Sequence, residues 1–379
     1  NSVGTGTAYD TSNTVEPGTS VFVSDWDTTA ESGGSSASNQ VVLPLQGCDV
    51  EDYDFRVYWG DGTWEAVATG GALLHTYDTP GSYVVSITGT IKGFSFGDSG
   101  DRLKLRHISQ WGPLGLGNCG SYFAGAEYLT VSASDAPDLS GVTTLENAFN
   151  NADAFNSDIT NWDTSLVENF NGMFANTAIF SLPLSSLNTA SAKSMAGMFD
   201  NAASFNSVLE PTGGGWDVVG VEDMSSMFSD AALFNQDISN WDTRTVQNMN
   251  GMFASTPAFN QPIGGWDTGA VTSMVNMFLG AAEFDQDIGS WDIADVTDMS
   301  GMFEDTAGLS TPNYNALLTG WAGQTVQPNV PFFAGPSQYS AGTPANAHAT
   351  LTGAPNTWTI TDAGQSAVPN APTNVQAVG

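Results

Sequence analysis

The sequence predicts a small β-sandwich followed by an α/β solenoid of short repeats, which a C-terminal cap closes. Three observations support this fold class. Short apolar segments separated by Gly, Pro and Ser fill much of residues 1–97, as in all-β domains. A unit of 25 residues then recurs through residues 145–309, which is typical of stacked repeat proteins. In residues 310–366 the repeat decays into apolar positions with helical spacing, as expected of a cap.

The composition limits the partners of the chain. Its 379 residues carry 40 acidic and 7 basic side chains, so the formal net charge is −33. Nucleic acids and anionic membranes attract basic proteins, so neither is expected as a partner. No apolar run is long enough for direct membrane insertion. Cations are the natural counter-charge, which makes calcium the expected cofactor. The two cysteines, Cys48 and Cys119, show no metal-binding spacing, and whether they pair stays open.

The repeat is clearest when the units are aligned on one phenylalanine. Successive units are 25 residues apart, with one step of 29 caused by an insertion at residues 210–214. In one unit Val246, Met249 and Met252 recur at steps of three, which predicts a short helix, whereas residues 234–241 predict an extended rung. One unit cannot bury its own apolar side, so we expect the units to stack into a solenoid. The aligned residues are Phe149, Phe174, Phe199, Phe228, Phe253, Phe278 and Phe303.

Equivalent positions form apolar columns along the expected solenoid. All 11 methionines fall in two columns, where we expect them to fill the core; a Met-rich binding surface is the alternative. A tryptophan column is interrupted by Leu187, which favours a core position over an exposed platform for carbohydrate stacking. If the column is such a platform, its ligand-binding residues include Trp241, Trp266 and Trp291.

Polar columns supply the other candidate residues. The residue after each tryptophan is acidic in most units, and we expect it to accept backbone N–H bonds at a helix start, with a row of cations as the alternative. This structural ladder comprises Asp163, Asp217, Asp242, Asp267 and Asp292. A shorter acidic column, interrupted by Pro262, gives better ligand or cation candidates, which are Asp158, Asp237 and Asp287. A third column of mostly Asn is expected to bond the turns between rungs.

The repeat resembles the BspA-like family of bacterial surface proteins, a leucine-rich-repeat relative. The likeness covers Leu145 to Phe303 and is strongest in Phe-Asn-Gln-Asp-Ile-Ser-Asn-Trp-Asp-Thr (234–243) and Val-Gln-Asn-Met-Asn-Gly-Met-Phe (246–253). The resemblance implies a leucine-rich-repeat-like solenoid in a non-enzymatic adhesin on the bacterial cell surface. Its ligand would be a protein or carbohydrate of a host, a neighbouring cell or the extracellular matrix.

The N-terminal domain, residues 1–97, carries a second resemblance. Short strands are expected at 21–23, 41–45, 55–58, 73–75 and 83–87. The hairpin at 58–63, His75-Thr76-Tyr77 and the turn at 80–83 resemble the polycystic-kidney-disease (PKD) type of immunoglobulin-like sandwich over residues 41–91. This resemblance implies a structural spacer or an adhesion module. Asp61 in the hairpin is a candidate metal ligand, although a turn role is expected first.

Residues 98–144 are expected to cap the solenoid and to form its first rungs. Basic residues alternate with leucine over 102–106, which predicts an edge or entry strand that caps the solenoid and whose charges discourage edge-to-edge pairing. Asp98 and Asp101 beside it are further candidate cation ligands. At the other end, residues 367–379 resemble the start of a fibronectin type III module, so we expect a linker to a following domain of a larger surface protein.

The expected function is therefore attachment rather than catalysis. Most carboxylates in the repeats are periodic, and periodicity indicates structure rather than a unique catalytic site. No Ser/His/Asp order, phosphate loop or zinc motif indicates an enzyme, so no catalytic residue is assigned. The alternatives are a purely structural extender of a surface protein and a polysaccharide-active enzyme.

Overall fold

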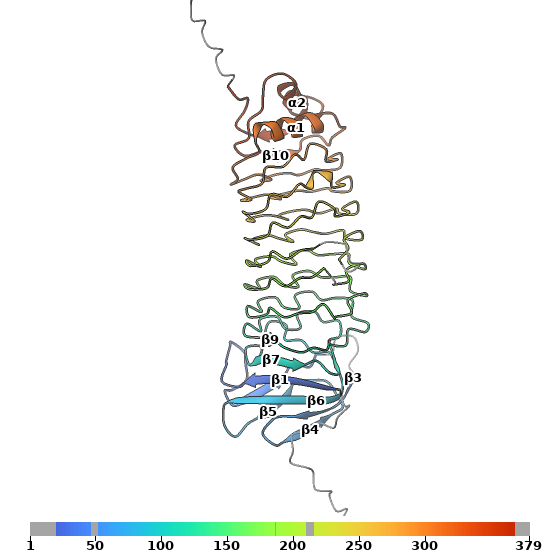
Figure 1. Cartoon of the computed structure of the whole chain (residues 1–379), viewed down its shortest axis with the longest axis vertical. Helices are drawn as coiled ribbons and strands as arrows, with labels where there is room; N and C mark the ends of the chain where they lie inside the picture. The colour runs from blue at the N-terminus through green and yellow to red at the C-terminus, as the bar shows by residue number, and fades with distance from the viewer. Residues whose placement is uncertain (1–19, 47–51, 186, 210–215, 368–379) are drawn as a thin grey trace, which may run out of the picture.

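The computed structural model describes residues 20–46, 52–185, 187–209 and 216–367. The molecule is a rod (Figure 1), with a β-sheet at one end, a column of stacked repeat units in the middle and two helices at the other end. Cys48, the insertion at 210–214 and nearly all of the expected linker at 367–379 lie outside the described residues.

The N-terminal part is built on a seven-stranded sheet. Its strands run in the order β4-β3-β6-β1-β7-β9, and β8 pairs with β6. These strands are β1 (Val21–Asp27), β3 (Asp52–Tyr58), β4 (Trp64–Val67), β6 (Ser82–Lys92), β7 (Leu105–Gln110), β8 (Leu114–Gly115) and β9 (Thr130–Val131). A second sheet pairs β2 (Gln40–Leu43) with β5 (Leu73–Thr76). All five predicted strands are confirmed, because each overlaps β1, β2, β3, β5 or β6, whereas β4 was not predicted.

The seven-stranded sheet is mixed, which corrects the predicted separate sandwich. β8 and β9 pair in parallel with β6 and β7, while the longer strands pair antiparallel. β7 lies between β1 and β9, so the strand predicted near 102–106 is an entry strand and its description as an edge strand is wrong. Its Leu105 and Ile108 are buried, and a strand with a buried face gains more from neighbours on both sides than from an open edge. The sheet thus continues into the chain that leads to the repeats.

The repeat units consist of turns where helices were predicted. Between β9 and the short 3-10 helix η1 (Ile263–Gly265), the described residues form turns and isolated parallel bridges, with no α-helix or longer strand. In one unit, alternate N–H groups bond to carbonyls of the next unit; these are the N–H groups of Met249, Gly251, Phe253 and Ser255. Two of the N–H groups between them, those of Met252 and Ala254, close turns within the unit.

Left-handed backbone explains why no helix forms. Gly251 has a φ of 60° and Ser255 a φ of 52°, and Gly, Asn, Ser or Asp occupies the equivalent positions in other units. A right-handed helix cannot contain such residues at every fourth position, and it would use every N–H within itself. The predicted class, an immunoglobulin-like (PKD-like) β-sandwich followed by an α/β leucine-rich-repeat-like solenoid, is therefore wrong. Mixed sheets and stacked coils of turns take its place.

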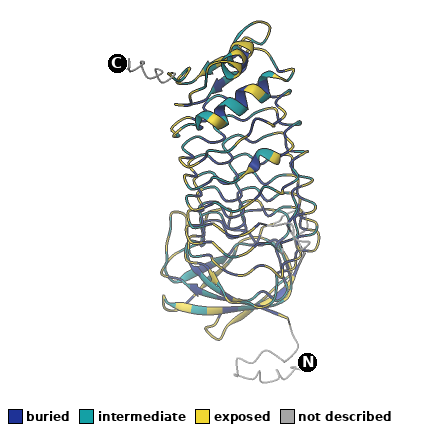
Figure 2. Ribbon diagram, turned by 45° about the horizontal axis from the view of Figure 1, so that its top comes forward, coloured by how far each residue is buried: buried dark blue, intermediate teal, exposed yellow. Residues whose placement is uncertain are grey.

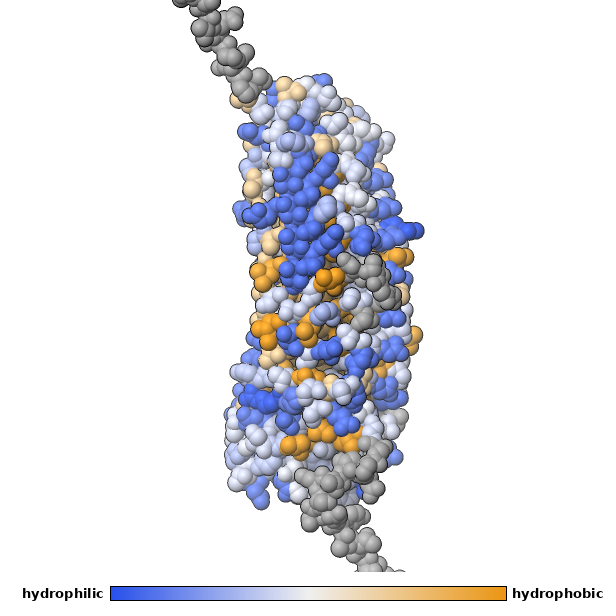
Figure 3. Space-filling view, viewed as in Figure 1, coloured by the Kyte–Doolittle hydropathy of each residue, from blue (hydrophilic) through white to orange (hydrophobic). Residues whose placement is uncertain are grey.

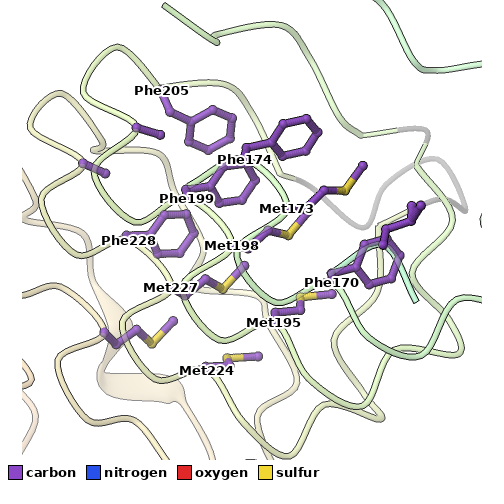
Figure 4. Packing of buried hydrophobic residues seen from close by; sticks show 14 of the residues in the cluster. Phe170, Met173, Phe174, Met195, Met198, Phe199, Phe205, Met224, Met227 and Phe228 are labelled. Carbon is purple, nitrogen blue, oxygen red and sulfur yellow. The ribbon is translucent and has the colours of Figure 1, made fainter. Parts of the chain in front are cut away.

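The core of the rod follows the predicted apolar columns. Every methionine of the two columns is buried, as are the aligned phenylalanines and the column tryptophans, which confirms their predicted core role. Figure 4 shows methionines and phenylalanines of these columns as parallel files that run from unit to unit. The ring centroid of Phe228 lies 3.8 Å from that of Phe234 in the same unit and 5.8 Å from that of Phe253 in the next. Near-parallel rings at these distances stack favourably in addition to the area they bury.

Amide side chains link the turns of successive units, as predicted for the Asn column. Asn235 Oδ1 accepts the N–H of Asn260 at 3.0 Å and Gln261 Nε2 at 2.8 Å. Asn260 in turn accepts the N–H of Asp285 at 3.0 Å and Gln286 Nε2 at 2.6 Å. These bonds satisfy groups that are only partly accessible to water and fix the register of neighbouring units.

The C-terminal end closes the column of rungs. The predicted helix is confirmed as α1 (Thr311–Ala322), whose Tyr314, Leu317, Leu318 and Trp321 are buried on one face. Beyond α1, β10 (Pro331–Phe333) and β11 (Thr359–Thr361) pair in parallel, and α2 (Thr343–Thr352) packs against α1. Figure 2 shows buried residues lining the inside of each coil up to this end, so the last rung does not expose its core.

Candidate functional site

The acidic ladder beside the tryptophans consists of residues that bond their own turns. Asp217 Oδ1 accepts the N–H of Val219 at 2.9 Å, and Asp292 Oδ1 accepts that of Ala294 at 3.0 Å. The same bond, two residues along the chain, is made by Asp163, Asp242 and Asp267. The acceptor role expected for these residues is present, although the bond closes a turn and not a helix start.

Local contacts favour the ionised form of two residues of this ladder, Asp163 and Asp242. Hydrogen bonds from the hydroxyl and the N–H of Ser165 lower the pKa of Asp163, and contacts from Arg244 lower that of Asp242. Both groups favour the ionised carboxylate, because a donor stabilises the charged form. No bound cation is needed to explain these ionised side chains.

The three acidic ligand candidates lie exposed on separate units. Asp158, Asp237 and Asp287 each accept the N–H two residues further on, at 2.8, 3.0 and 2.9 Å. The units between them carry Pro183, Val208 and Pro262 at the equivalent positions, so the carboxylates do not form a continuous row. They are available to solvent one at a time.

The three candidate tryptophans are in the interior of the rod. Trp241, Trp266 and Trp291 are at most 4% exposed, and their rings stack in parallel with centroids 6.4 Å apart. Each Nε1 donates to a main-chain carbonyl of the preceding unit at 3.0–3.1 Å. In this position the rings pack on one another and do not offer a face to a ligand.

Asp61 lies in the hairpin between β3 and β4, bound to protein partners. It accepts the N–H of Thr63 at 2.9 Å and contacts His75 Nε2 at 2.8 Å. Burial alone would raise the pKa of Asp61, but the hydrogen bonds from Thr63 and His75 lower it overall. The ring of His75 is stacked on Trp59 at 4.5 Å, so this group is tied into the packing of the N-terminal part.

Asp98 and Asp101 are paired with cations of the chain itself. Arg102 Nε lies 3.0 Å from Asp98 Oδ1. Asp101 is buried with Lys104, whose Nζ lies 3.4 Å away and donates to three main-chain carbonyls. Asp101 also accepts the N–H groups of Ser36 and Val42 at 2.7 and 2.6 Å. Throughout the described ranges, no three His, Cys, Asp or Glu side chains gather closely enough to hold a metal ion.

Two of the hollows on the surface of the described residues bear on a candidate site. The larger, about 400 Å³, lies between residues 42–46 and 95–101 beside the buried Asp101, and it is open to solvent. The smaller, about 110 Å³, lies between two units at Trp216 and Trp241 and is almost wholly apolar. Neither hollow contains an arrangement of nucleophile, base and acid such as catalysis would need.

A comparison with protein families shows which family the repeats belong to. The family described as Mycoplasma protein of unknown function, DUF285, matches residues 117–212 and 209–321, which is more than half of the chain. The chain belongs to the DUF285 family. No curated protein and no solved structure matches it significantly.

The surface of this DUF285 chain is mostly polar along the rod. Figure 3 shows a hydrophilic stripe over the upper rungs and separate apolar side chains over the middle ones. Apolar residues that are about half exposed in these rungs include Leu166, Ile179, Val208 and Leu233. In the part of the chain that the structure describes, no helix has the length and apolar character required to cross a membrane.

The residues that sequence reasoning missed lie outside the DUF285 match, on the N-terminal sheet. Tyr58 and Trp64 are 41% and 44% exposed and oppose each other across β3 and β4. The sequence feature that could have revealed their exposure is the alternation in β3, in which Phe55 and Val57 are buried while Arg56 and Tyr58 are exposed. It was not sufficient because β4 and its register with β3 were not predicted.

Proposed function

We propose that this DUF285 chain is an adhesive module of a bacterial cell-surface protein, and that its ligand is an extracellular protein or carbohydrate. One observation supports this proposal most strongly: a single apolar core runs from Phe22 in β1 to Trp358 next to β11. Close-packed interiors resist deformation, so the sheet and the cap at the two ends are held at a fixed separation. Such a rod suits a protein that presents a surface away from its point of attachment.

The proposal also includes relationships to two further families, which the DUF285 match does not itself show. Segments 234–243 and 246–253 support a relation to BspA-like surface proteins, and the hairpin at 58–63 with its His75 partner supports a relation to PKD domains. The extracellular, cell-surface location rests on the same likenesses. Other domains of a larger surface protein would then adjoin this module.

A role in binding is proposed in preference to catalysis because of how the carboxylates are used. Those of the repeats mostly bond the turns beside them, and they follow the repeat instead of converging on one point. Glycoside hydrolysis requires two carboxylates that face each other across a substrate. Turnover of a polysaccharide or peptide by the purified chain would contradict this part of the proposal.

A structural extender is the second candidate, and one feature favours it. Asn235, Asn260 and their Gln partners are used in bonds between units, so these polar columns have little capacity left for a ligand. In the combined view, the repeats provide length and stiffness, and a ligand binds elsewhere on the rod. A module of this kind gains strength by acting in several copies on one cell surface.

The test is a binding screen of the whole chain. We would print neutral and acidic polysaccharides and a panel of matrix proteins, and measure retention of the labelled chain against a heat-unfolded sample. Retention by at least one class of probe is expected. A folded chain that is retained by none of them would contradict adhesion and leave the extender.

Calcium is a separate proposal that rests on the charge of −33. A native state that binds calcium must become more stable when calcium is added. The Tm in calcium would then exceed the Tm in magnesium at equal ionic strength, and a chelator would remove the difference. Equal values in both salts would show only general screening of the acidic surface.

A further inference from the structure

One tryptophan differs from all the others in its exposure. All 11 tryptophans lie within the described residues, and ten of them are at most 5% exposed. Trp64 in β4 is 44% exposed. Exposing a large ring to water costs free energy that burial would recover, so a chain that buries ten rings and leaves one accessible calls for an explanation.

Trp64 is part of a group of exposed apolar side chains on one face of the sheet. It pairs with Tyr58 across β3 and β4, and Tyr58 pairs with Ser86 on β6. Paired residues point to the same face, as do residues two apart on one strand, which adds Val84 to the group. Tyr58, Trp64 and Val84 are 41%, 44% and 51% exposed. We call these three side chains the sheet platform.

The charge around the sheet platform limits what can bind there. The guanidinium of Arg56 lies over the ring of Trp64, 5.0 Å from its centroid. A cationic ligand is therefore disfavoured, because the positive charge of Arg56 beside the exposed ring would repel it. An anionic ligand is disfavoured by the net charge of −33 on the chain. What remains is an uncharged ligand with apolar faces and polar edges.

A neutral polysaccharide has this chemistry. One face of a pyranose ring presents C–H groups that pack on an aromatic ring, while its hydroxyls bond to polar side chains at the edge. Arg56 supplies donors at the edge of the sheet platform, and Asp54 on the same face of β3 supplies acceptors. Three side chains are too few for a stable protein interface, which buries about 800 Å² per partner.

We propose that the sheet platform of Trp64, Tyr58 and Val84 binds an uncharged polysaccharide by stacking. The inference rests on the proposed adhesive function and gives it a site and a ligand class. It also places that site at the end of the rod, away from the repeat residues chosen from the sequence.

The experiment measures binding of the full chain to insoluble cellulose and chitin and to their soluble oligosaccharides. Trp64→Ala and Tyr58→Ala are each expected to weaken binding at least about tenfold, which corresponds to the loss of about 1.4 kcal/mol. Trp64→Phe keeps a ring and should retain most of the binding. Tyr128→Ala is the matched control, because Tyr128 is also an exposed aromatic residue with an arginine over its ring: the guanidinium of Arg106 lies 4.3 Å from its centroid. Arg106 is on β7, three to four strands from β3 and β4, which places this pair about 15–20 Å from Tyr58 and Trp64. Tyr128→Ala should change binding less than twofold.

Fluorescence gives a readout of the site itself. Acrylamide is uncharged and quenches accessible tryptophans, so most of its effect on this chain should come from Trp64. Oligosaccharide binding is expected to protect Trp64 from acrylamide, and Trp64→Phe should remove the quenchable signal while binding persists. An unchanged Tm in each variant shows that the fold is intact.

The outcomes separate this inference from the proposed function. Polysaccharide binding that Trp64→Ala and Tyr58→Ala leave unchanged overturns the sheet platform but not adhesion. Retention by matrix proteins without any binding to cellulose, chitin or their oligosaccharides also overturns the sheet platform but not adhesion, and it indicates a protein partner. A folded chain that binds no probe of either class overturns both.

Discussion

Replacement of Phe228 by alanine tests whether the stacked phenylalanines hold the rod together. The ring is fully buried, and its centroid lies 3.8 Å from that of Phe234, 5.6 Å from Phe199, 5.8 Å from Phe253 and 6.1 Å from Trp241. A buried Phe→Ala change costs about 3–5 kcal/mol, since the lost transfer energy and the cavity add. These neighbouring rings belong to the same packed core, so we expect the upper half of this range.

The assay is urea unfolding followed by far-UV circular dichroism and tryptophan fluorescence, with Leu233→Ala as control. Leu233 lies in the same unit but is 57% exposed, so its removal should change the free energy of unfolding by less than about 0.5 kcal/mol. The two probes should report the same midpoint if neighbouring units unfold together. A loss below about 1 kcal/mol for Phe228→Ala, or equal losses in both variants, would refute the reasoning.

Three further changes follow from single contacts. Asn235→Ala should lower the free energy of unfolding by about 1–2 kcal/mol, whereas Asn235→Asp, which keeps the acceptor oxygen, should lower it less. Equal decreases for the two variants in urea unfolding would contradict this. Lys104→Met should lower the free energy of unfolding by about 3–5 kcal/mol, because the buried carboxylate of Asp101 loses its ion-pair partner. Adding Asp101→Asn removes the unpaired charge and should recover part of the loss in the same assay. Asp163 has a lowered pKa, so its stabilising effect is present above its unfolded pKa and disappears as pH falls through the folded value. Ser165→Ala should raise that pKa in an NMR titration, and an unchanged value would show that the hydroxyl has no role.

The apolar columns of the repeat could be predicted because each unit shows the same positions again. Spacing of three between Val246, Met249 and Met252 indicates that they face one way, and the structure buries all three. It does not distinguish a helix from a coil in which alternate N–H groups bond to the next unit. The informative residues were Gly251 and the Asn, Asp or Gly that other units carry in place of Ser255, because these types tolerate left-handed backbone better than most.

The candidate residues were harder to place for a related reason. A column of Asp or Trp looks alike in sequence whether its side chains face a ligand, a neighbouring turn or the core. Trp241 and Trp64 differ only in their surroundings, and those depend on pairings between units or strands. Register across β3 and β4 depends on the alternation of both strands and on the turn that joins them, so the pattern of one strand alone does not determine it.

The hydrogen bonds between units also determine how this rod responds to a pulling force. They run from rung to rung, and the first and last rungs are also bonded to the sheet and to the cap. Tension applied to the two ends of the chain should therefore unravel the stack inward only after the sheet or the cap has detached. Each 25-residue unit that detaches would release about 80 Å of chain, since an extended residue spans about 3.3–3.6 Å. A cell tethered through such a chain would experience a series of small extensions as units detach, instead of one rupture. Each extension would leave the remaining rungs intact.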